Sequence, residues 1–239
     1  MTAVIRHPEW LTLQIDGQPF YGFDQEWYPQ GRQRMAGCGP TVGSDMMTYV
    51  EMKEWKVPAV TRDEAVRKML EVWKYATPHM HGLYKTHWLR DGLNQYMADH
   101  GLRGKAESMS IPALHLVAPR ASKVARFIEE GLRADCPVGF LNLHSGTEPI
   151  PYHWHWMVLV KLEDIGQGHM VTLWDEGKPL RFNLENWLAT TKFGGSFVRV
   201  MGTGVLLHYR KAVSGNLKGR KHNEYSENSG TGRWFDCIV

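Results

Sequence analysis

Apolar residues recur at helical spacing in the first half of the chain, whereas in the second half they alternate or form short continuous runs. The helical spacing predicts helices over residues 40–55, 61–77, 86–100 and 122–134. The second pattern predicts strands over residues 138–143, 156–160, 170–174, 179–182 and 196–207, and a short, ambiguous one over 111–118. A hairpin is expected over residues 11–21, where Asp16-Gly17 supplies a tight turn. Because helices and strands are segregated along the chain, the pattern indicates an α+β fold.

Local signals indicate where these helices begin and end. Pro40 suits the first turn of a helix, because its missing N–H would have no partner there. Thr61 and Glu64 have the spacing of a capping box. Gly101 is expected to end the third helix, and Ser122 to cap the start of the fourth.

Length and composition limit the domain organisation and the classes of partner. The chain has 239 residues, which we interpret as one domain over residues 1–210 followed by a polar, Gly-rich and flexible extension over 211–239. Its net charge of +3 is too small to favour nucleic acid. No stretch of about 18 apolar residues is present, and the N-terminus lacks a signal-peptide pattern. We therefore expect neither a membrane nor a nucleic-acid partner, and no pattern indicates an oligomeric state.

The cysteines favour a reducing compartment. Cys38, Cys136 and Cys237 are widely spaced, and their odd number disfavours a disulfide framework. A cytoplasmic location is the simplest expectation.

Cys38 lies between two glycines, directly before the helix predicted from Pro40. The unpaired N–H groups and the positive dipole end of that helix favour a thiolate, which is the nucleophilic form of cysteine. Gly37 and Gly39 allow a sharp turn that leaves the sulfur uncovered. The alternative is a small buried cysteine at a helix start, because cysteine often packs as a hydrophobic residue.

A nucleophilic cysteine needs a base, and the base needs a group that orients it. His155 begins a predicted strand, where its side chain can reach a cleft. Folding this strand and the next one antiparallel about the middle of their loop places His155 opposite residue 176, within two positions. Asp175 and Glu176 lie there, and spacing favours a His155–Asp175 pair in which the carboxylate holds the imidazole ring and its tautomer. Alternatively, Asp175 only begins a turn.

Other histidines offer a second base or a metal site. His153 is the rival base, because residues two apart on a strand share a face. His153-x-His155 and His79-x-His81 also have a pattern that suits a metal. However, the sequence has no HExxH motif and no obvious third ligand. We therefore expect no metal and no other cofactor, and a histidine-based metal protein is the weaker hypothesis.

An oxyanion hole needs donors aimed at the developing negative charge. The Cys38 N–H is one candidate. A side-chain amide of Gln25, Gln30 or Gln33 could supply the second, and each of the three could equally be an exposed loop residue.

Four motifs, in this order, resemble the papain-like cysteine peptidase superfamily, and most of all its bacteriocin-processing, or double-glycine, peptidases. They are Gln25-Glu26-Trp27-Tyr28-Pro29, Gly37-Cys38-Gly39-Pro40-Thr41, His155-Trp156-Met157-Val158 and Trp174-Asp175-Glu176-Gly177. The resemblance covers roughly residues 20–200. It implies a helical N-terminal half, with the nucleophile at a helix N-terminus, packed on an antiparallel sheet that carries the histidine and the aspartate.

The same resemblance implies a role for each site residue. Cys38 would be the nucleophile, His155 the general acid and base, Asp175 the orienting group and Gln25 the oxyanion donor. The family glutamine often lies closer to the cysteine, which would favour Gln30 or Gln33, whereas relatives with longer loops place it further upstream, as Gln25 is here. The adjacent acids at this turn keep Glu176 as an alternative to Asp175.

We therefore expect a cysteine hydrolase, and specifically a peptidase, that acts on a peptide or amide through a thioester. An acyl transferase would use the same residues, because the two activities differ only in the second nucleophile, which has no sequence motif. A catalytically silent binding or scaffold module with the same fold is the third hypothesis.

Overall fold

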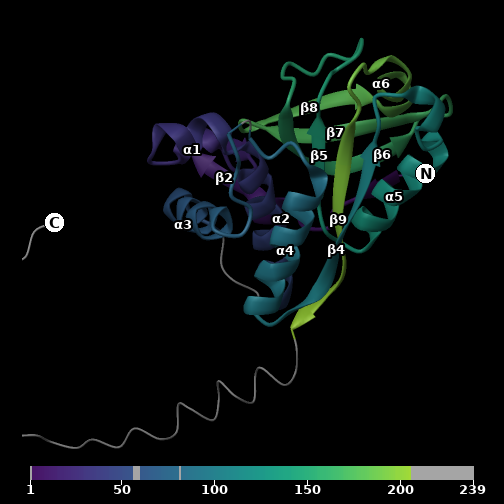
Figure 1. Ribbon diagram of the computed structural model, residues 1–239. Coiled ribbons are helices and arrows are strands. Elements are labelled where there is room, and N and C mark those ends of the chain that lie inside the picture. The colour runs from purple at the N-terminus through teal and green to yellow at the C-terminus, as the bar shows by residue number, and fades with distance from the viewer. Residues whose placement is uncertain (1, 56–59, 81, 206–239) are drawn as a thin grey trace, which may run out of the picture. The chain divides into compact units, whose positions relative to one another are not determined.

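In the part of the chain that the structure describes, residues 2–55, 60–80 and 82–205, a seven-stranded sheet forms the centre of the fold (Figure 1). The structure is a computed structural model. The strand order is β4-β9-β5-β6-β7-β8, and β1 pairs with the outer part of β6. These pairings are all antiparallel. The strands are β1 (Thr2–Val4), β4 (Leu102–Ile111), β5 (Val138–Asn142), β6 (His155–Asp164), β7 (His169–Asp175), β8 (Lys178–Asn183) and β9 (Gly195–Val205).

Helices cover both faces of this sheet, with α1 to α4 on one side and α5 on the other (Figure 1). A separate hairpin is formed by β2 (Thr12–Ile15) and β3 (Gln18–Tyr21). Among the described residues, the short 3-10 helices are η1 (Pro8–Leu11), η2 (Gln25–Trp27) and η3 (His115–Val117). The α-helices are α1 (Gly31–Ala36), α2 (Cys38–Trp55), α3 (Arg62–Trp73), α4 (Thr86–Asp99), α5 (Ala121–Arg133) and α6 (Leu184–Thr190).

Helix α2 is buried over nearly its whole length and lies directly on the sheet. A Cβ placed on Gly139 of β5 would lie 3.3 Å from Val42 Cγ1 and 3.4 Å from Met46 Sδ. On another side of the helix, a Cβ on Gly43 would lie 3.1 Å from Leu89 Cδ1 of α4. Small residues on both elements therefore let α2 approach β5 and α4 closely, and this close packing sets the position of the helix N-terminus.

The α+β class is confirmed, and the helices and strands predicted over residues 40–55, 61–77, 86–100, 122–134 and 138–205 are present with shifted ends, whereas residues 206 and 207 of the last predicted strand lie outside the described residues. The hairpin over residues 11–21 is confirmed. The capping box of α3 is also present: the Glu64 N–H donates to Thr61 Oγ1 (3.3 Å), and the Thr61 N–H donates to Glu64 Oε2 (2.8 Å). Gly101 follows α4 in a left-handed conformation, with φ of +63°.

Two local predictions are wrong. Of the strand predicted over 111–118, only Ile111 is extended in a sheet, because β4 ends there and the chain then turns into η3. Ser122 does not cap α5, which begins at Ala121 after Arg120 and has no side-chain cap.

Besides the three short 3-10 helices, four described elements have no counterpart among the predictions: β1, α1, β4 and α6. Strand β4 is the longest of them, and it lies at an edge of the sheet. Gly104, with φ of +143°, accompanies a shift in register between Arg103 and Lys105. This irregularity interrupts the alternation of apolar and polar residues by which strands are recognised.

The described residues form one compact unit. The extension predicted over residues 211–239 lies outside the described residues. Within the described ranges, no helix has the length and apolar character needed to cross a membrane.

Candidate active site

Cys38 is the first residue of α2, so this helix begins two residues earlier than Pro40 predicts. The Gly37 carbonyl accepts the hydrogen bond of the Thr41 N–H at 2.9 Å, which closes the first turn. The N–H groups of Cys38 and Gly39 precede the first intrahelical donor, so the helix provides them with no acceptor. The Cys38 side chain is partly exposed, whereas the next fourteen residues of the helix are buried.

The two glycines beside Cys38 are required for close packing rather than for a left-handed turn. Gly37 has φ of −85°. A Cβ on Gly37 would lie 2.6 Å from the Tyr28 ring. A Cβ on Gly39 would lie 3.0 Å from Leu83 Cβ and 3.3 Å from Trp156 Cδ1. The expected sharp turn is therefore not the role of these glycines. Their missing side chains instead let α2 pack closely against Tyr28, Leu83 and Trp156.

His155 is the first residue of β6, and the structure places Asp175, the last residue of β7, against it. His155 Nε2 and Asp175 Oδ1 are 2.8 Å apart, and each side chain is only 10% exposed. The strand register pairs Val158 with Trp174, one residue from the expected register. The proximity that the hairpin spacing predicted is therefore present, and the contact lies just beyond the end of the β6–β7 ladder.

The side chains of Cys38 and His155 line the same small pocket, and Cys38 influences the protonation of the imidazole. Asp175 contacts the imidazole through Nε2, so Nδ1 is the ring nitrogen available to a second group. Burial lowers the pKa of His155, but the hydrogen bond with Asp175, the nearby Cys38 side chain and the charges of both outweigh it and raise this pKa to about 10. The ring therefore keeps its proton at neutral pH.

Gln25 is the one of the three candidate glutamines that lies beside these groups. It begins η2, and the N-cap residue Asp24 anchors this turn by accepting the Glu26 N–H at 2.8 Å. Gln30 is exposed before α1, and Gln33 is buried within α1. A small pocket has among its lining residues Gln25, Cys38, Asp45, His155, Asp175 and Glu176.

Glu176 also lines the pocket, but its carboxylate hydrogen-bonds with a residue other than His155. Its Oε2 accepts a hydrogen bond from the Tyr152 hydroxyl at 3.0 Å, and its backbone is left-handed, with φ of +47°. The geometry therefore separates the two adjacent acids, because Asp175 contacts His155 and Glu176 contacts Tyr152.

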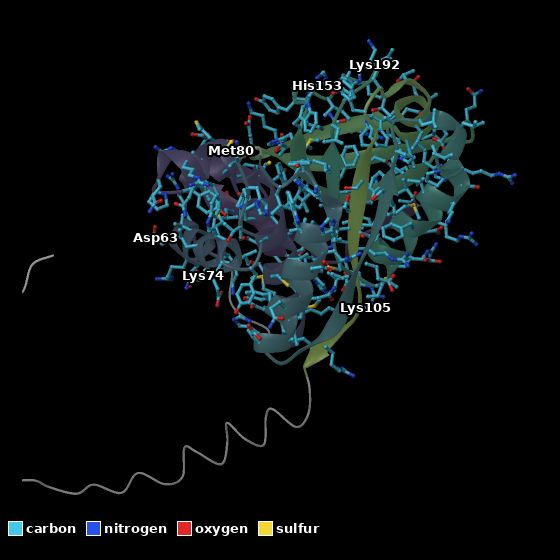
Figure 2. The ribbon with its side chains drawn as sticks, viewed as in Figure 1. Asp63, Lys74, Met80, Lys105, His153 and Lys192 are labelled. Carbon is cyan, nitrogen blue, oxygen red and sulfur yellow. The ribbon has the colours of Figure 1, made fainter. Side chains whose placement is uncertain are left out.

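The expectation that His153 and His155 share a strand face is wrong. Strand β6 begins at His155, and Trp154 has φ of +56°, which breaks the alternation of side chains before the strand. The His153 ring stacks on His144 instead, with centroids 4.8 Å apart. Figure 2 shows the exposed His153 at the same end of the molecule as Lys192.

The described residues provide no cluster of metal-ligating side chains that would support the hypothesis of a metal site. Within residues 2–55, 60–80 and 82–205, no group of three or more His, Cys, Asp or Glu side chains could hold a metal ion. The His79 ring lies against Trp88, with centroids 4.1 Å apart, and His81 is outside the described residues.

Asp45 is a pocket residue that the sequence interpretation missed. It lies two turns after Cys38 on the same face of α2, and it is 2% exposed. Its Oδ1 accepts the Phe23 N–H at 3.0 Å, which fastens the segment before Gln25 to α2. Burial raises the pKa of Asp45 well above its ordinary value, and the charge of Asp175 adds to this increase against the opposing hydrogen bond from Phe23. The sequence did contain a signal for this pocket residue, because an acidic residue two helical turns after Cys38 interrupts an otherwise apolar helix face.

Comparison with known proteins adds no relative: no protein-family model matches the chain, and no curated protein matches its sequence significantly.

The raised pKa of His155 predicts how stability depends on pH. The proton is held more tightly in the folded state, so its stabilising effect is fully present below about pH 6.5 and is lost as the pH rises toward 10. We expect the difference in free energy of unfolding between the wild type and His155→Gln to shrink over this range. Urea unfolding of both proteins at several pH values measures it, and a difference that stays constant or grows would contradict the assignment.

Proposed function

We propose that the protein is a cysteine peptidase that cleaves an amide bond through a thioester on Cys38. The observation that carries this proposal is that one buried imidazole, His155, contacts the carboxylate of Asp175 at 2.8 Å and shares a small pocket with the thiol of Cys38. Such an arrangement provides a nucleophile, a base and a group that orients the base.

The first half of the reaction follows from these positions. The Cys38 sulfur attacks the carbonyl carbon of the amide, and the carbonyl oxygen becomes negatively charged. We assign the Cys38 N–H and the Gln25 side-chain amide as the donors to this oxygen, and the support is that both residues line the pocket. His155 then gives its proton to the departing amine as the C–N bond breaks, leaving a thioester.

The second half reverses the proton transfers. Neutral His155 takes a proton from a water molecule, which attacks the thioester carbonyl. The C–S bond breaks, the carboxylic acid leaves, and the proton on His155 restores the starting pair with Cys38. Throughout, Asp175 holds the ring orientation and stabilises its positive charge.

We also propose that the fold is of the papain-like type. Its support is the order of the site residues along the chain, Gln25, Cys38, His155 and Asp175, together with their placement. The cysteine begins a buried helix that packs on an antiparallel sheet, and the histidine and the carboxylate lie on neighbouring strands of that sheet.

Alkylation of Cys38 by iodoacetamide tests the proposal. At about pH 6, where ordinary thiols are almost fully protonated, we expect Cys38 to react at least about 10-fold faster than N-acetylcysteine. Mass spectrometry after digestion separates Cys38 from Cys136, which is fully buried and serves as an internal control. His155→Ala should remove the excess rate. If wild-type Cys38 reacts like N-acetylcysteine, the proposal fails and a binding module of this fold is the better reading.

Acylation tests the role of Gln25 separately. The p-nitrophenyl acetate reaction passes through an oxyanion, whereas iodoacetamide alkylation does not. We expect Gln25→Ala to slow the burst of p-nitrophenol by about 10²–10³-fold while leaving the alkylation rate unchanged. Gln30→Ala is the matched control, because this exposed glutamine does not line the pocket. Equal effects of the two substitutions on the burst would contradict the role of Gln25.

A further inference from the structure

Trp154 combines a strained backbone with an exposed side chain. Its φ of +56° lies in the left-handed region, which glycine, asparagine and aspartate adopt far more readily than a bulky aromatic residue. Its side chain is nevertheless 55% exposed, so burial does not explain why tryptophan occupies this position. Strained backbone conformations of this kind cluster at active sites and at segments that hold a ligand.

Trp154 belongs to a group of aromatic side chains that we call the aromatic rim: Tyr84, Tyr152, Trp154 and Phe193. The ring of Trp154 lies 6.3 Å from Tyr84 and 6.3 Å from Phe193, centroid to centroid. Phe193 is 51% exposed and Tyr152 is 42% exposed. Three separate segments of the chain supply these rings, so the rim is formed by the fold and not by one loop alone.

The aromatic rim lies next to His155 and is connected to the Cys38 side of the candidate active site through Leu83. Trp154 directly precedes His155, and the Tyr152 ring lies 5.2 Å from the His155 ring. Tyr84 follows Leu83, whose carbonyl accepts the Trp156 Nε1–H at 2.6 Å and whose side chain closes over Gly39, next to Cys38. Consecutive Cα atoms are about 3.8 Å apart. The backbone of Trp154 is therefore close to that of His155, and the backbone of Tyr84 is close to that of Leu83, which packs against Gly39.

Polar contacts distinguish the members of the rim. The Tyr152 hydroxyl is bonded to Glu176, and Lys85 Nζ lies 6.0 Å from the centre of the Tyr84 ring. Trp154 and Phe193 instead contribute broad, uncharged ring surface. Aromatic and flat apolar groups bind such surfaces through offset-stacked or edge-to-face contacts.

We infer that the aromatic rim is a substrate subsite for an aromatic side chain next to the scissile amide, with Trp154 as its specificity-determining residue. This inference rests on the proposed peptidase function. It narrows the substrate class to peptides that carry an aromatic residue beside the bond to be cleaved.

Two chloroacetamides with one reactive group test the subsite. In each reaction the Cys38 sulfur forms a bond to the methylene carbon and chloride leaves, so only the amide substituent differs. After normalising to N-acetylcysteine, we expect N-benzyl-2-chloroacetamide to alkylate wild-type Cys38 about 10-fold faster than N-ethyl-2-chloroacetamide. Equal normalised rates would overturn the inference while leaving the proposed function intact. Failure of both reagents to outpace N-acetylcysteine would overturn the proposed function and, with it, the inference.

Trp154→Gly separates binding from folding. Glycine adopts the left-handed conformation without strain, so the melting temperature should stay the same or rise. The N-benzyl preference, measured as the ratio of the N-benzyl rate to the N-ethyl rate within the same variant, should fall to about 1. Trp154→Asn, which also tolerates this conformation, and Phe193→Ala provide independent variants that should weaken the preference. A preference that survives in all three variants would overturn the inference.

Trp55→Ala is the matched control. Trp55 is 42% exposed and ends α2, whereas Cys38 begins it. The residue is therefore an exposed tryptophan far from the site, and its removal should leave the benzyl preference of Cys38 unchanged. Loss of the preference in this variant would show that the effect does not arise at the aromatic rim.

Discussion

The close contact between the N-terminus of α2 and the sheet is the constraint on which the rest of the site depends. Gly39 leaves room for Leu83 and Trp156, and Gly139 leaves room for Val42 and Met46 of the helix. A larger side chain at these glycines would push α2 away from β5 and β6. Because Cys38 is the first residue of α2 and His155 the first of β6, this packing brings thiol and imidazole together. Packing of the core therefore sets the positions of the Cys38 and His155 side chains.

Electrostatics then determine the state of the groups that packing brings together. His155 is buried, which opposes a charge, yet Asp175 at its Nε2 and the neighbouring Cys38 side chain favour the protonated ring. Asp45 lies in the same pocket, but its burial favours the neutral acid, which limits repulsion of Asp175. Its hydrogen bond to Phe23 links α2 to the segment that carries Gln25. Two of the carboxyl groups that line the pocket thus have different roles: Asp175 stabilises charge and Asp45 fastens a loop.

Periodicity and turn spacing predicted the main helices and the approach of Asp175 to His155, because both depend on local geometry. The choice among the glutamines could not be made this way, since it depends on η2 and α1, which the sequence pattern did not predict. The placement of His153 failed because the left-handed backbone at Trp154 interrupts the alternation on which the prediction relied. Strand β4 was missed because an edge position and an irregular register at Gly104 remove its pattern. Local rules thus fail where tertiary packing sets the backbone.

The most direct test of the central claim is an NMR titration of the His155 imidazole in the wild type and in Cys38→Ala. Assignment by comparison with His155→Gln identifies its ring signals. The ring should stay protonated through neutral pH in the wild type and titrate near pH 10, and its pKa should fall when the sulfur is removed. A wild-type pKa near the ordinary value of 6.5, unchanged in Cys38→Ala, would show that thiol, imidazole and carboxylate do not act as one unit.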